Sequence, residues 1–445
     1  MNTWRSSFQK LFYYPSAVLG MLVVFLLVFL AIYAMIKIPY REAIRLWRGG
    51  EEVWYQNPKL APPAWFNLFS SKKYVESFAV KTSDGSMEKK VETADQDITT
   101  YTMTHTFDFE YDYYPQEMIV YVTSKFTEKQ SFVSLEWLKP DGETVRIANL
   151  AIGKKHTYRF SQDDKLKTKL RTDEVIPVLF SLPDENVPVK GKYQLLITGT
   201  TFEPDSDINV EFVLHGQVFG LAGTDHARRD LVVPLLWGTP VALAFGLIAS
   251  LGTAVLTMII AAVGAWYGSW VDELIQRITE INLVLPFLSI LILIGTFYSR
   301  SIWVILGATI LLSIFTGAIK GFRAIFVQLK ESMYIEAARA YGASNPRIVF
   351  LYLIPRMIPL LIPGLVLSVP AFVFLEAGLA VLGLGDPVLP TWGKMIDDAN
   401  RNAALYRGYY YWILEPTILL MVTGLGFAML GFALDRVFNP KLRDA

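Results

Sequence analysis

Long uncharged stretches of apolar residues recur along the chain and are separated by shorter charged segments. A helix of about 20 apolar residues crosses roughly 30 Å of hydrocarbon. Six stretches reach or approach that length, at residues 17–36, 231–271, 281–299, 301–319, 357–375 and 416–434. One such stretch is compatible with a buried helix in a soluble protein, but six in one chain predict a polytopic membrane protein with six transmembrane helices.

Two of these stretches need interpretation. The first is longer than the apolar core of a secretory signal peptide, which has about 7–15 residues, so we expect it to remain as a membrane anchor. The stretch at residues 231–271 is long enough for one tilted helix or two short ones. Because Pro234 and Pro240 both lie near its start, we predict a lead-in to about Pro240 and then one long helix that ends near Gly268.

Residues 41–230 have a different composition, with 29 of the 41 acidic residues, 24 of the 41 basic residues and all four histidines. This density of charge indicates a soluble segment. Short alternating runs rich in β-branched and aromatic residues predict strands at residues 119–123, 132–138, 144–147, 193–198 and 208–214. The turn residues 140–142 (PDG) predict a hairpin between the second and third of these. Several short strands favour a β-sandwich, whereas residues 41–75 look more helical and irregular.

The predicted organisation has three parts. Residues 1–40 hold the N-terminus and the first transmembrane helix, residues 41–222 form an inserted extracytoplasmic β-rich domain, and residues 223–445 form a five-helix core. The fold class is therefore mainly α-helical and polytopic, with a β-rich insertion between helices 1 and 2. The aromatic run 107–114 (FDFEYDYY) is compatible with stacking on a sugar or peptide, but it is more typical of a strand with one buried aromatic face.

The distribution of positive charge predicts the orientation. The segment 320–356 carries Lys320, Arg323, Lys330, Arg339, Arg347 and Arg356, and the tail adds Arg436, Lys441 and Arg443. Cytoplasmic loops are enriched in such residues, and six spans place both termini on one side, so we expect a multi-pass protein of the cytoplasmic membrane with both termini cytoplasmic. The cations that follow the first span, Lys37, Arg41, Arg45 and Arg48, disagree, although long translocated domains largely escape this rule.

The chain has no cysteine and no net charge, which excludes disulfides and thiolate metal sites. The histidines are far apart and lack an HxxxH spacing, so ordinary structural histidines are favoured over a metal site. No GxxxxGK[ST] phosphate loop occurs. No HExxH, GxSxG or paired intramembrane aspartates occur either, which disfavours an intramembrane enzyme.

The segment between the fourth and fifth apolar stretches has an internal pattern of its own, EAARAYGASNPRIVFLYLIP at residues 336–355. A helix-forming run opens it, Gly342 breaks the helix, and residues 343–346 turn the chain. A second amphipathic run, residues 347–354, is predicted to end at Pro355. A short helix, a glycine and a second helix in a loop between spans form a lever that a soluble partner can grip.

This pattern resembles the EAA loop of ABC importer permeases, in which EAA is followed by three residues, Gly, nine residues and I-x-L-P. Glu336, Ala337, Ala338, Gly342 and Pro355 match, whereas Tyr352 and Ile354 replace the usual Ile and Leu. Further segments resemble the "C"-type permeases of the dipeptide, oligopeptide and nickel branch. These are residues 14–17 (YPSA), 223–225 (GTD) with 229–230 (RD), 267–272 (YGSWVD), 376–377 (EA), 382–385 (LGLG), 390–393 (PTWG) and 439–443 (NPKLR).

The resemblance covers residues 1–37 and 222–445. Arg228 stands where that branch usually has Gly, and residues 41–220 replace a much shorter loop. The resemblance implies a transmembrane permease subunit that moves peptides or a related small solute. It implies four kinds of partner: a second homologous permease, two cytoplasmic ATPases, an extracytoplasmic solute-binding protein and membrane lipid. It implies no nucleic acid, no enzymatic activity and no cofactor in this chain, since ATP and Mg²⁺ would bind the ATPases.

The resemblance assigns coupling to the ATPase to a loop at about residues 321–356, through Glu336, Ala337, Ala338, Arg339, Tyr341, Gly342 and Pro355. We expect Lys330, Glu331 and Tyr334 to line the same contact. Two interpretations of Arg339 stay open, an ion pair with partner carboxylates and an ordinary solvated or headgroup charge.

Three further questions stay open at this point. Glu376, late in an apolar span, is either a residue of the substrate path or gate, or a structural carboxylate, because a charge there is costly unless it faces the bundle interior or a partner. The substrate is equally open between peptides, nickel chelates and oligosaccharides, which relatives of this branch carry. The alternative function is a membrane-anchored sensor or scaffold whose β-domain binds an extracytoplasmic partner.

Overall fold

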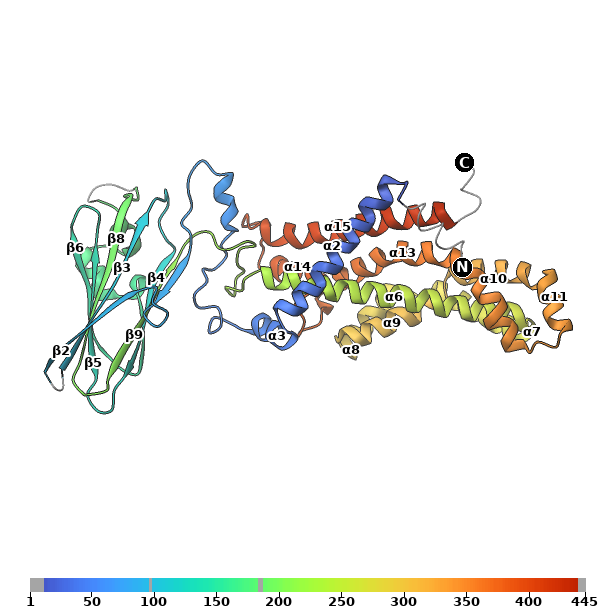
Figure 1. The fold of residues 1–445 in the computed structure, drawn as a ribbon, viewed down its shortest axis with the longest axis horizontal. Coiled ribbons are helices and arrows are strands. Elements are labelled where there is room, and N and C mark those ends of the chain that lie inside the picture. Colours follow the sequence, from blue (N-terminus) through green and yellow to red (C-terminus); the bar gives the residue numbers. More distant parts are fainter. Residues whose placement is uncertain (1–11, 96–97, 183–186, 439–445) are drawn as a thin grey trace. The chain divides into compact units, whose positions relative to one another are not determined.

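The computed structural model describes residues 12–95, 98–182 and 187–438. The chain divides into two compact units, which we describe separately (Figure 1). The helical unit comprises Met1–Arg48 and Val233–Ala445, and the β unit comprises Gly49–Val232. Helix α3 (Tyr40–Arg48) groups with the helices, whereas the sequence placed the start of the insertion at residue 41.

Four helices of the described chain are long and apolar enough to cross a membrane. They are α2 (Pro15–Lys37), α6 (Val232–Tyr267), the continuous helix Asn345–Leu384 and α15 (Tyr411–Phe438). Two bent pairs of shorter helices bring the number to six if each pair is counted as one span. The predicted fold class, a polytopic helical membrane protein with an inserted β-rich domain, is confirmed.

The bent pairs differ from the straight helices expected at residues 281–299 and 301–319. Helix α7 (Ser269–Val284) meets α8 (Phe287–Phe297) at 79°, and α9 (Ile302–Ile314) meets α10 (Gly317–Lys330) at 49°. The first break has a clear cause. Pro286 disfavours helical backbone at the preceding residue, and Leu285 is accordingly extended, with φ −68° and ψ 135°.

The second break is held by side chains of neighbouring helices. Asn282 of α7 donates its amide protons to the carbonyl oxygens of Leu312 (2.9 Å) and Phe315 (2.7 Å). The Thr257 hydroxyl of α6 donates to the carbonyl oxygen of Ile314 at 3.0 Å. These bonds satisfy carbonyl groups that the end of α9 leaves without helical partners, as hydrocarbon requires.

Helix α6 is a single long helix, as predicted, but the predicted lead-in to Pro240 is wrong. The helix begins at Val232 and contains Pro240 in its interior. Trp392, the first residue of α14 (Trp392–Arg401), packs against this turn and donates its indole N–H to the Leu235 carbonyl oxygen at 2.9 Å. Gly238 makes room for that indole, since a Cβ there would lie 2.2 Å from it.

Helices α2 and α15 cross at two glycines. A Cβ on Gly20 would lie 2.7 Å from the backbone nitrogen of Leu430, and a Cβ on Gly426 would lie 2.5 Å from a methyl group of Val23. Small residues let transmembrane backbones approach closely. This crossing joins the first span to the last one.

The β unit is a sandwich of two antiparallel sheets. The four-stranded sheet has the order β1 (Phe78–Lys81), β9 (Asp207–His215), β4 (Glu117–Lys125) and β7 (Lys155–Arg159). The five-stranded sheet has the order β2 (Glu88–Asp95), β3 (Ile98–Phe109), β8 (Gly191–Thr201), β5 (Ser131–Leu138) and β6 (Thr144–Ile152). All five predicted strands and the β5–β6 hairpin are present, whereas β1, β2, β7 and the part of β3 before residue 107 were not predicted as strands.

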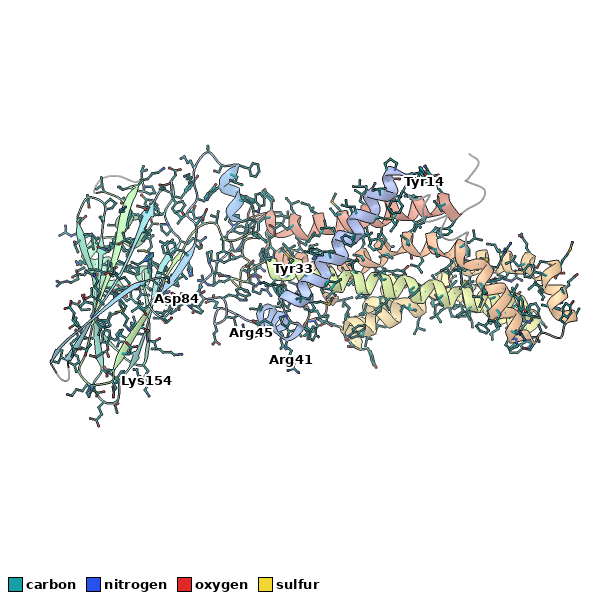
Figure 2. All side chains as sticks on the ribbon, in the orientation of Figure 1. Tyr14, Tyr33, Arg41, Arg45, Asp84 and Lys154 are labelled. Carbon is teal, nitrogen blue, oxygen red and sulfur yellow. The ribbon has the colours of Figure 1, made fainter. Side chains whose placement is uncertain are left out.

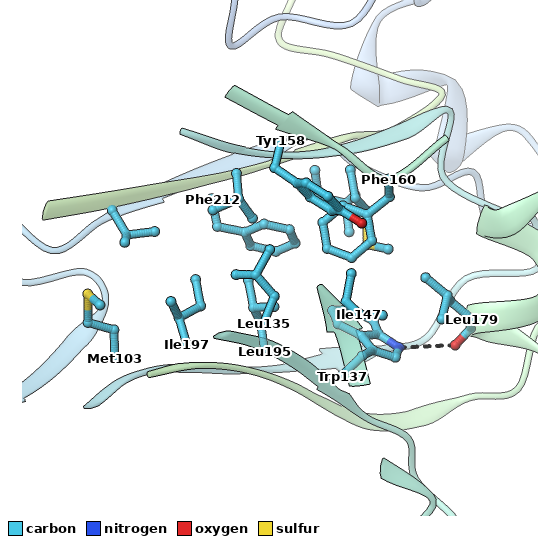
Figure 3. Close-up of a cluster of buried hydrophobic side chains, with 14 of the residues drawn as sticks. Met103, Leu135, Trp137, Ile147, Tyr158, Phe160, Leu179, Leu195, Ile197 and Phe212 are labelled. Atoms are coloured by element: carbon cyan, nitrogen blue, oxygen red, sulfur yellow. Dashed lines mark hydrogen bonds between the residues drawn. The ribbon is translucent and has the colours of Figure 1, made fainter. Parts of the chain in front are cut away.

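The core of the sandwich is strongly aromatic (Figure 3). Trp137 of β5 is fully buried and donates its indole N–H to the carbonyl oxygen of Leu179 at 3.1 Å. That carbonyl belongs to α5 (Val175–Phe180), which with α4 (Asp164–Leu170) closes one side of the sandwich. The aromatic run 107–114 is only partly a strand, since β3 ends at Phe109, whose ring is also buried.

The chain enters and leaves the β unit through adjacent segments, which we call the neck (residues 55–77 and 215–230). The Asn57 amide donates to the Arg228 carbonyl oxygen at 3.0 Å, and the Arg228 guanidinium donates to the Asn57 carbonyl oxygen at 2.6 Å. At the other end of the neck, the Gly216 N–H donates to the Ser77 hydroxyl at 2.8 Å. The backbone of Arg228 has φ +65°, a conformation that favours glycine, which explains why a glycine is usual at this point of the motif.

His215 is buried in the neck. Its Nε2 lies 3.0 Å from the Tyr55 carbonyl oxygen, and its Nδ1 lies 3.2 Å from the Arg228 guanidinium. A neutral imidazole suits this setting, because Nδ1 accepts from Arg228 while Nε2–H donates to Tyr55. Burial, reinforced by the positive charge of Arg228, lowers the pKa of His215 from 6.5 to about 4.

The pKa of His215 predicts an acid-sensitive neck. Below pH 6.5 the unfolded chain binds a proton at His215 that the folded chain takes up only near pH 4. His215 therefore makes its full contribution to the free energy of unfolding above pH 6.5. As the pH falls to about 4, the free energy of unfolding decreases by about 3 kcal/mol. Urea unfolding of the full-length chain measures this loss. His215→Gln is the control, and an equally steep pH dependence in that variant would contradict the assignment.

Candidate functional site

Helix α11 (Met333–Ala340) is a short helix in the segment between α10 and α12 (Asn345–Ile348). It starts after Ser332, whose carbonyl oxygen accepts from Ile335 N–H at 2.9 Å. At its C-terminal end, Gly342 has φ +80° and the Ala343 N–H donates to the Ala338 carbonyl oxygen at 3.0 Å. This is the left-handed glycine that commonly ends helices, and it agrees with the helix break predicted at Gly342.

The two faces of α11 differ sharply in exposure. Ile335 is fully buried and Ala338 is 9% exposed, whereas Met333 is 87% exposed and Tyr341 is 92% exposed. Glu336, Ala337 and Arg339 are also exposed. Ile335 joins an apolar cluster with Phe326 of α10 and Ile348 of α12. The helix therefore has one fixed face and one open face.

A tryptophan at the end of α6 holds the C-terminal part of α11. The guanidinium carbon of Arg339 lies 4.5 Å from the ring centroid of Trp266, and the Lys330 Nζ lies 5.7 Å from the same centroid. Lys330 also donates to the carbonyl oxygens of Ala265 (3.2 Å) and Trp266 (3.0 Å), at the C-terminal end of α6, where a positive charge is favourable. Arg339 is thus engaged within its own chain, an arrangement that neither of its two sequence interpretations contained.

A second ionic contact ties α10 to α7. Arg323 donates from its Nε to an Asp272 carboxylate oxygen at 2.6 Å and from an Nη to the other oxygen. Together with the Trp266 contacts, this pair links α6, α7, α10 and α11 at one end of the helical unit. These contacts connect α11 directly or indirectly to three other helices.

The structure brings most of the predicted coupling residues together. Glu336, Ala337, Arg339, Tyr341 and Gly342 lie on α11 or at its end, and Ala338 lies there too but faces inward. The sequence missed Trp266, although it lies next to the recognised segment 267–272. Its link to Arg339 has no local signature, since the two residues are in different helices.

Pro355 lies apart from this group, and the helix end predicted there is wrong. Residues Asn345–Leu384 form one continuous helix, in which a π-helical turn (Val349–Leu353) precedes α13 (Ile354–Leu379). Pro355 falls in the first turn of α13. Pro355 has no backbone N–H, and the π-helical turn before it shifts the hydrogen-bond pattern locally. The helix therefore continues through Pro355. The second half of the loop is consequently an extension of a transmembrane helix.

Glu376 lies at the other end of α13 and is 7% exposed. Its carboxylate is hydrogen-bonded to the hydroxyl of Thr391, the residue that caps α14 by accepting from the Lys394 N–H at 3.1 Å. Asp397, on the next turn of α14, is also buried and is paired with Lys394 at 2.9 Å and Arg401 at 2.7 Å. This geometry gives Glu376 a structural partner and leaves its role in a substrate path as an expectation.

Comparison with known proteins identifies the helical part. Residues 254–444 match the family described as the binding-protein-dependent transport system inner membrane component. The dipeptide transport system permease protein DppC of Alkalihalophilus pseudofirmus is 30% identical over 225 residues, which are 50% of this chain and 72% of the relative. The chain belongs to this family of membrane permeases.

Other permeases of the family show similar agreement. The oligopeptide transport system permease protein OppC of Bacillus subtilis is 29% identical over 50% of this chain and 72% of its own length. The glutathione transport system permease protein GsiD of Pectobacterium atrosepticum is 26% identical over 50% of this chain and 73% of its own length. The predicted likeness to "C"-type permeases of ABC importers is confirmed, and permeases of this family act with a binding protein and an ATPase. The family match contains all of α11 and starts inside α6, so it excludes the β unit.

The permease offers a direct test of how α11 is held. Trp266→Leu removes the ring under Arg339, and we expect the amide protons of α11 to exchange about fivefold faster, because a cation–π contact with an exposed arginine contributes about 1 kcal/mol. Hydrogen exchange followed by mass spectrometry of the full-length chain measures this. Trp270→Leu is the matched control, since Trp270 lies on the adjacent helix and is 70% exposed. Equal exchange in both variants would show that Trp266 does not hold α11.

Proposed function

We propose that this permease pairs with a second, homologous permease and that a peptide or a related small solute crosses the cytoplasmic membrane between them. ATP and Mg²⁺ bind separate cytoplasmic ATPase subunits, two per transporter, and an extracytoplasmic binding protein delivers the solute. The names of the similar permeases, which include dipeptide, oligopeptide and glutathione systems, support this substrate class.

The observation that carries the proposal is the exposure of α11. Met333 and Tyr341 are large apolar side chains that remain almost fully exposed on a helix whose opposite face is packed. Exposed apolar groups beside polar ones are typical of a docking surface. In the proposed mechanism an ATPase grips Met333, Glu336 and Tyr341, and the contacts of Ile335 and Arg339 pass its movement to the spans. Pro355 lies in the first turn of α13, where the loop continues into that helix.

The same proposal fixes the orientation. The end of the bundle that carries α11 faces the cytoplasm, and both termini lie on that side, in agreement with the basic residues between residues 320 and 356. The β unit then lies outside, on the side of the binding protein. Its size exceeds what a connection between two spans requires, and loops of such length usually carry function.

Two substitutions in α11 test the coupling role. Gly342→Pro demands φ near −65° where the chain has +80°, and Glu336→Arg reverses an exposed charge on the docking face. We expect both variants to insert normally and to lose the stimulation of ATP hydrolysis by loaded binding protein in the reconstituted transporter.

The matched control is Glu273→Arg, which makes the same charge reversal at an exposed position of α7. This variant should retain stimulation. If stimulation persists in both α11 variants, the docking assignment is wrong. If the control also loses stimulation, the loss results from the change in surface charge and not from the position of Glu336 on α11.

Removal of the sandwich tests the role of the β unit. Because Ser77 and Gly216 are hydrogen-bonded to each other at 2.8 Å, residues 78–214 can be replaced by a short glycine linker that keeps the neck ends together. We expect insertion to persist, while binding-protein affinity and uptake fall at least tenfold. Unchanged affinity and uptake would leave the sandwich as a stability element of this permease.

The alternative function, a sensor or scaffold anchored by the helices, predicts a different outcome. A sensor would lose its signal with the sandwich, yet Gly342→Pro would leave it unaffected, because an anchor has no use for a docked α11. The Gly342 and deletion variants together therefore separate the two functions.

A further inference from the structure

An open apolar pocket of about 250 Å³ lies in the helical unit, on the side where α2 ends and α6 begins. Its wall is formed by Tyr40 of α3, by Trp237, Ala244 and Phe245 of α6, and by Trp303 and Leu306 of α9. The lining is almost entirely hydrocarbon and aromatic. Nothing in the coupling or transport roles argued above uses it.

Helix α3 contributes its first residue, Tyr40, to the wall of this pocket, and the helix has two distinct faces. Ala43 and Trp47 are buried, whereas Arg41, Arg45 and Arg48 are exposed at a spacing that places them on one helix face. Figure 2 shows Arg41 and Arg45 projecting from α3. The helix is fixed to α6 at its start, where the Trp237 indole N–H donates to the Ile38 carbonyl oxygen at 3.0 Å and the Tyr40 ring lies 5.8 Å from that of Trp237.

The arginines of α3 differ in their partners. Arg45 is paired with Glu42 through hydrogen bonds of 2.6 and 2.8 Å. Arg41 and Arg48 have no ion pair within the described parts of the chain. Two unneutralised guanidiniums therefore stand on a helix that directly follows a transmembrane span. Such a helix lies at the boundary between hydrocarbon and headgroups, the level that Tyr and Trp also prefer.

We propose that this pocket is a binding site for an anionic phospholipid of the leaflet in which α2 ends. Arg41 and Arg48 bind the negatively charged headgroup, and one acyl chain lies along Trp237 and Ala244 in the pocket. Charge complementarity selects the headgroup, and the apolar lining selects the chain. The site also accounts for the cluster of basic residues that follows the first span. The orientation predicted from the other loops does not explain why these basic residues lie on that side of the membrane.

A site-specific probe tests the proposal. The chain has no cysteine, so Ala244→Cys gives a unique position for a benzophenone maleimide inside the pocket. The full-length chain is placed in nanodiscs of phosphatidylcholine with a minor share of phosphatidylglycerol and is irradiated. We expect lipid adducts enriched in phosphatidylglycerol over the bulk ratio, by about fivefold for each of the two guanidiniums. Trp303→Cys, at the exposed rim, replaces the probe if the first variant folds poorly.

Paired variants show whether the arginines of α3 select the lipid. Arg41→Gln with Arg48→Gln should return the adducts to the bulk ratio. Glu42→Gln with Arg45→Gln changes the same helix but removes a neutralised pair, and it should keep the enrichment. The proposal is overturned by adducts at the bulk ratio in the parent chain, by equal enrichment in both double variants, or by cross-links to a partner permease in the assembled transporter, which would make the pocket a protein interface.

Discussion

The absence of water inside a bilayer governs how this chain is put together, because any backbone group released by a helix break must find a partner within the protein. The helical unit has several such breaks, and the described side chains that lie beside them are polar ones from other helices. Asn282 and Thr257 bind carbonyl groups at the end of α9. Each of these bonds also joins two helices, so the same contacts that permit bending make the bundle cohere.

That cohesion reaches the cytoplasmic end proposed for the permease. Trp266 ends α6 and lies under Arg339 of α11, while Lys330 binds the last carbonyl groups of α6. A short helix of eight residues would be only marginally stable by itself. It is ordered here because Ile335 is packed beneath it and Gly342 ends it cleanly, which leaves Met333 and Tyr341 free to meet a partner.

The sequence predicted the spans, the sandwich and the α11 segment because each has a local signature: uncharged length, alternation, or a helix followed by glycine. It failed where distant residues decide the local geometry. Pro240 and Pro355 suggested helix boundaries, yet both lie within helices, and a π-helical turn precedes Pro355. Arg339 contacts Trp266, and Glu376 contacts Thr391. Each contact joins residues of different segments, and the local sequence pattern gives no sign of such pairs. The edge strands β1 and β7 were missed because each has only four or five residues, too few for a clear alternation of apolar and polar positions.

The closed neck of the β unit changes the thermodynamics of the connection between α3 and α6. Without it, folding of the helical unit would have to close a loop of roughly 180 residues, and closure entropy grows with the logarithm of loop length. Because Asn57 and Arg228 are bonded to each other in both directions, a folded neck shortens the effective loop to roughly a dozen residues, a saving of about 2 kcal/mol. A large domain can therefore reside between two spans at little entropic expense to the bundle, provided that the neck folds first.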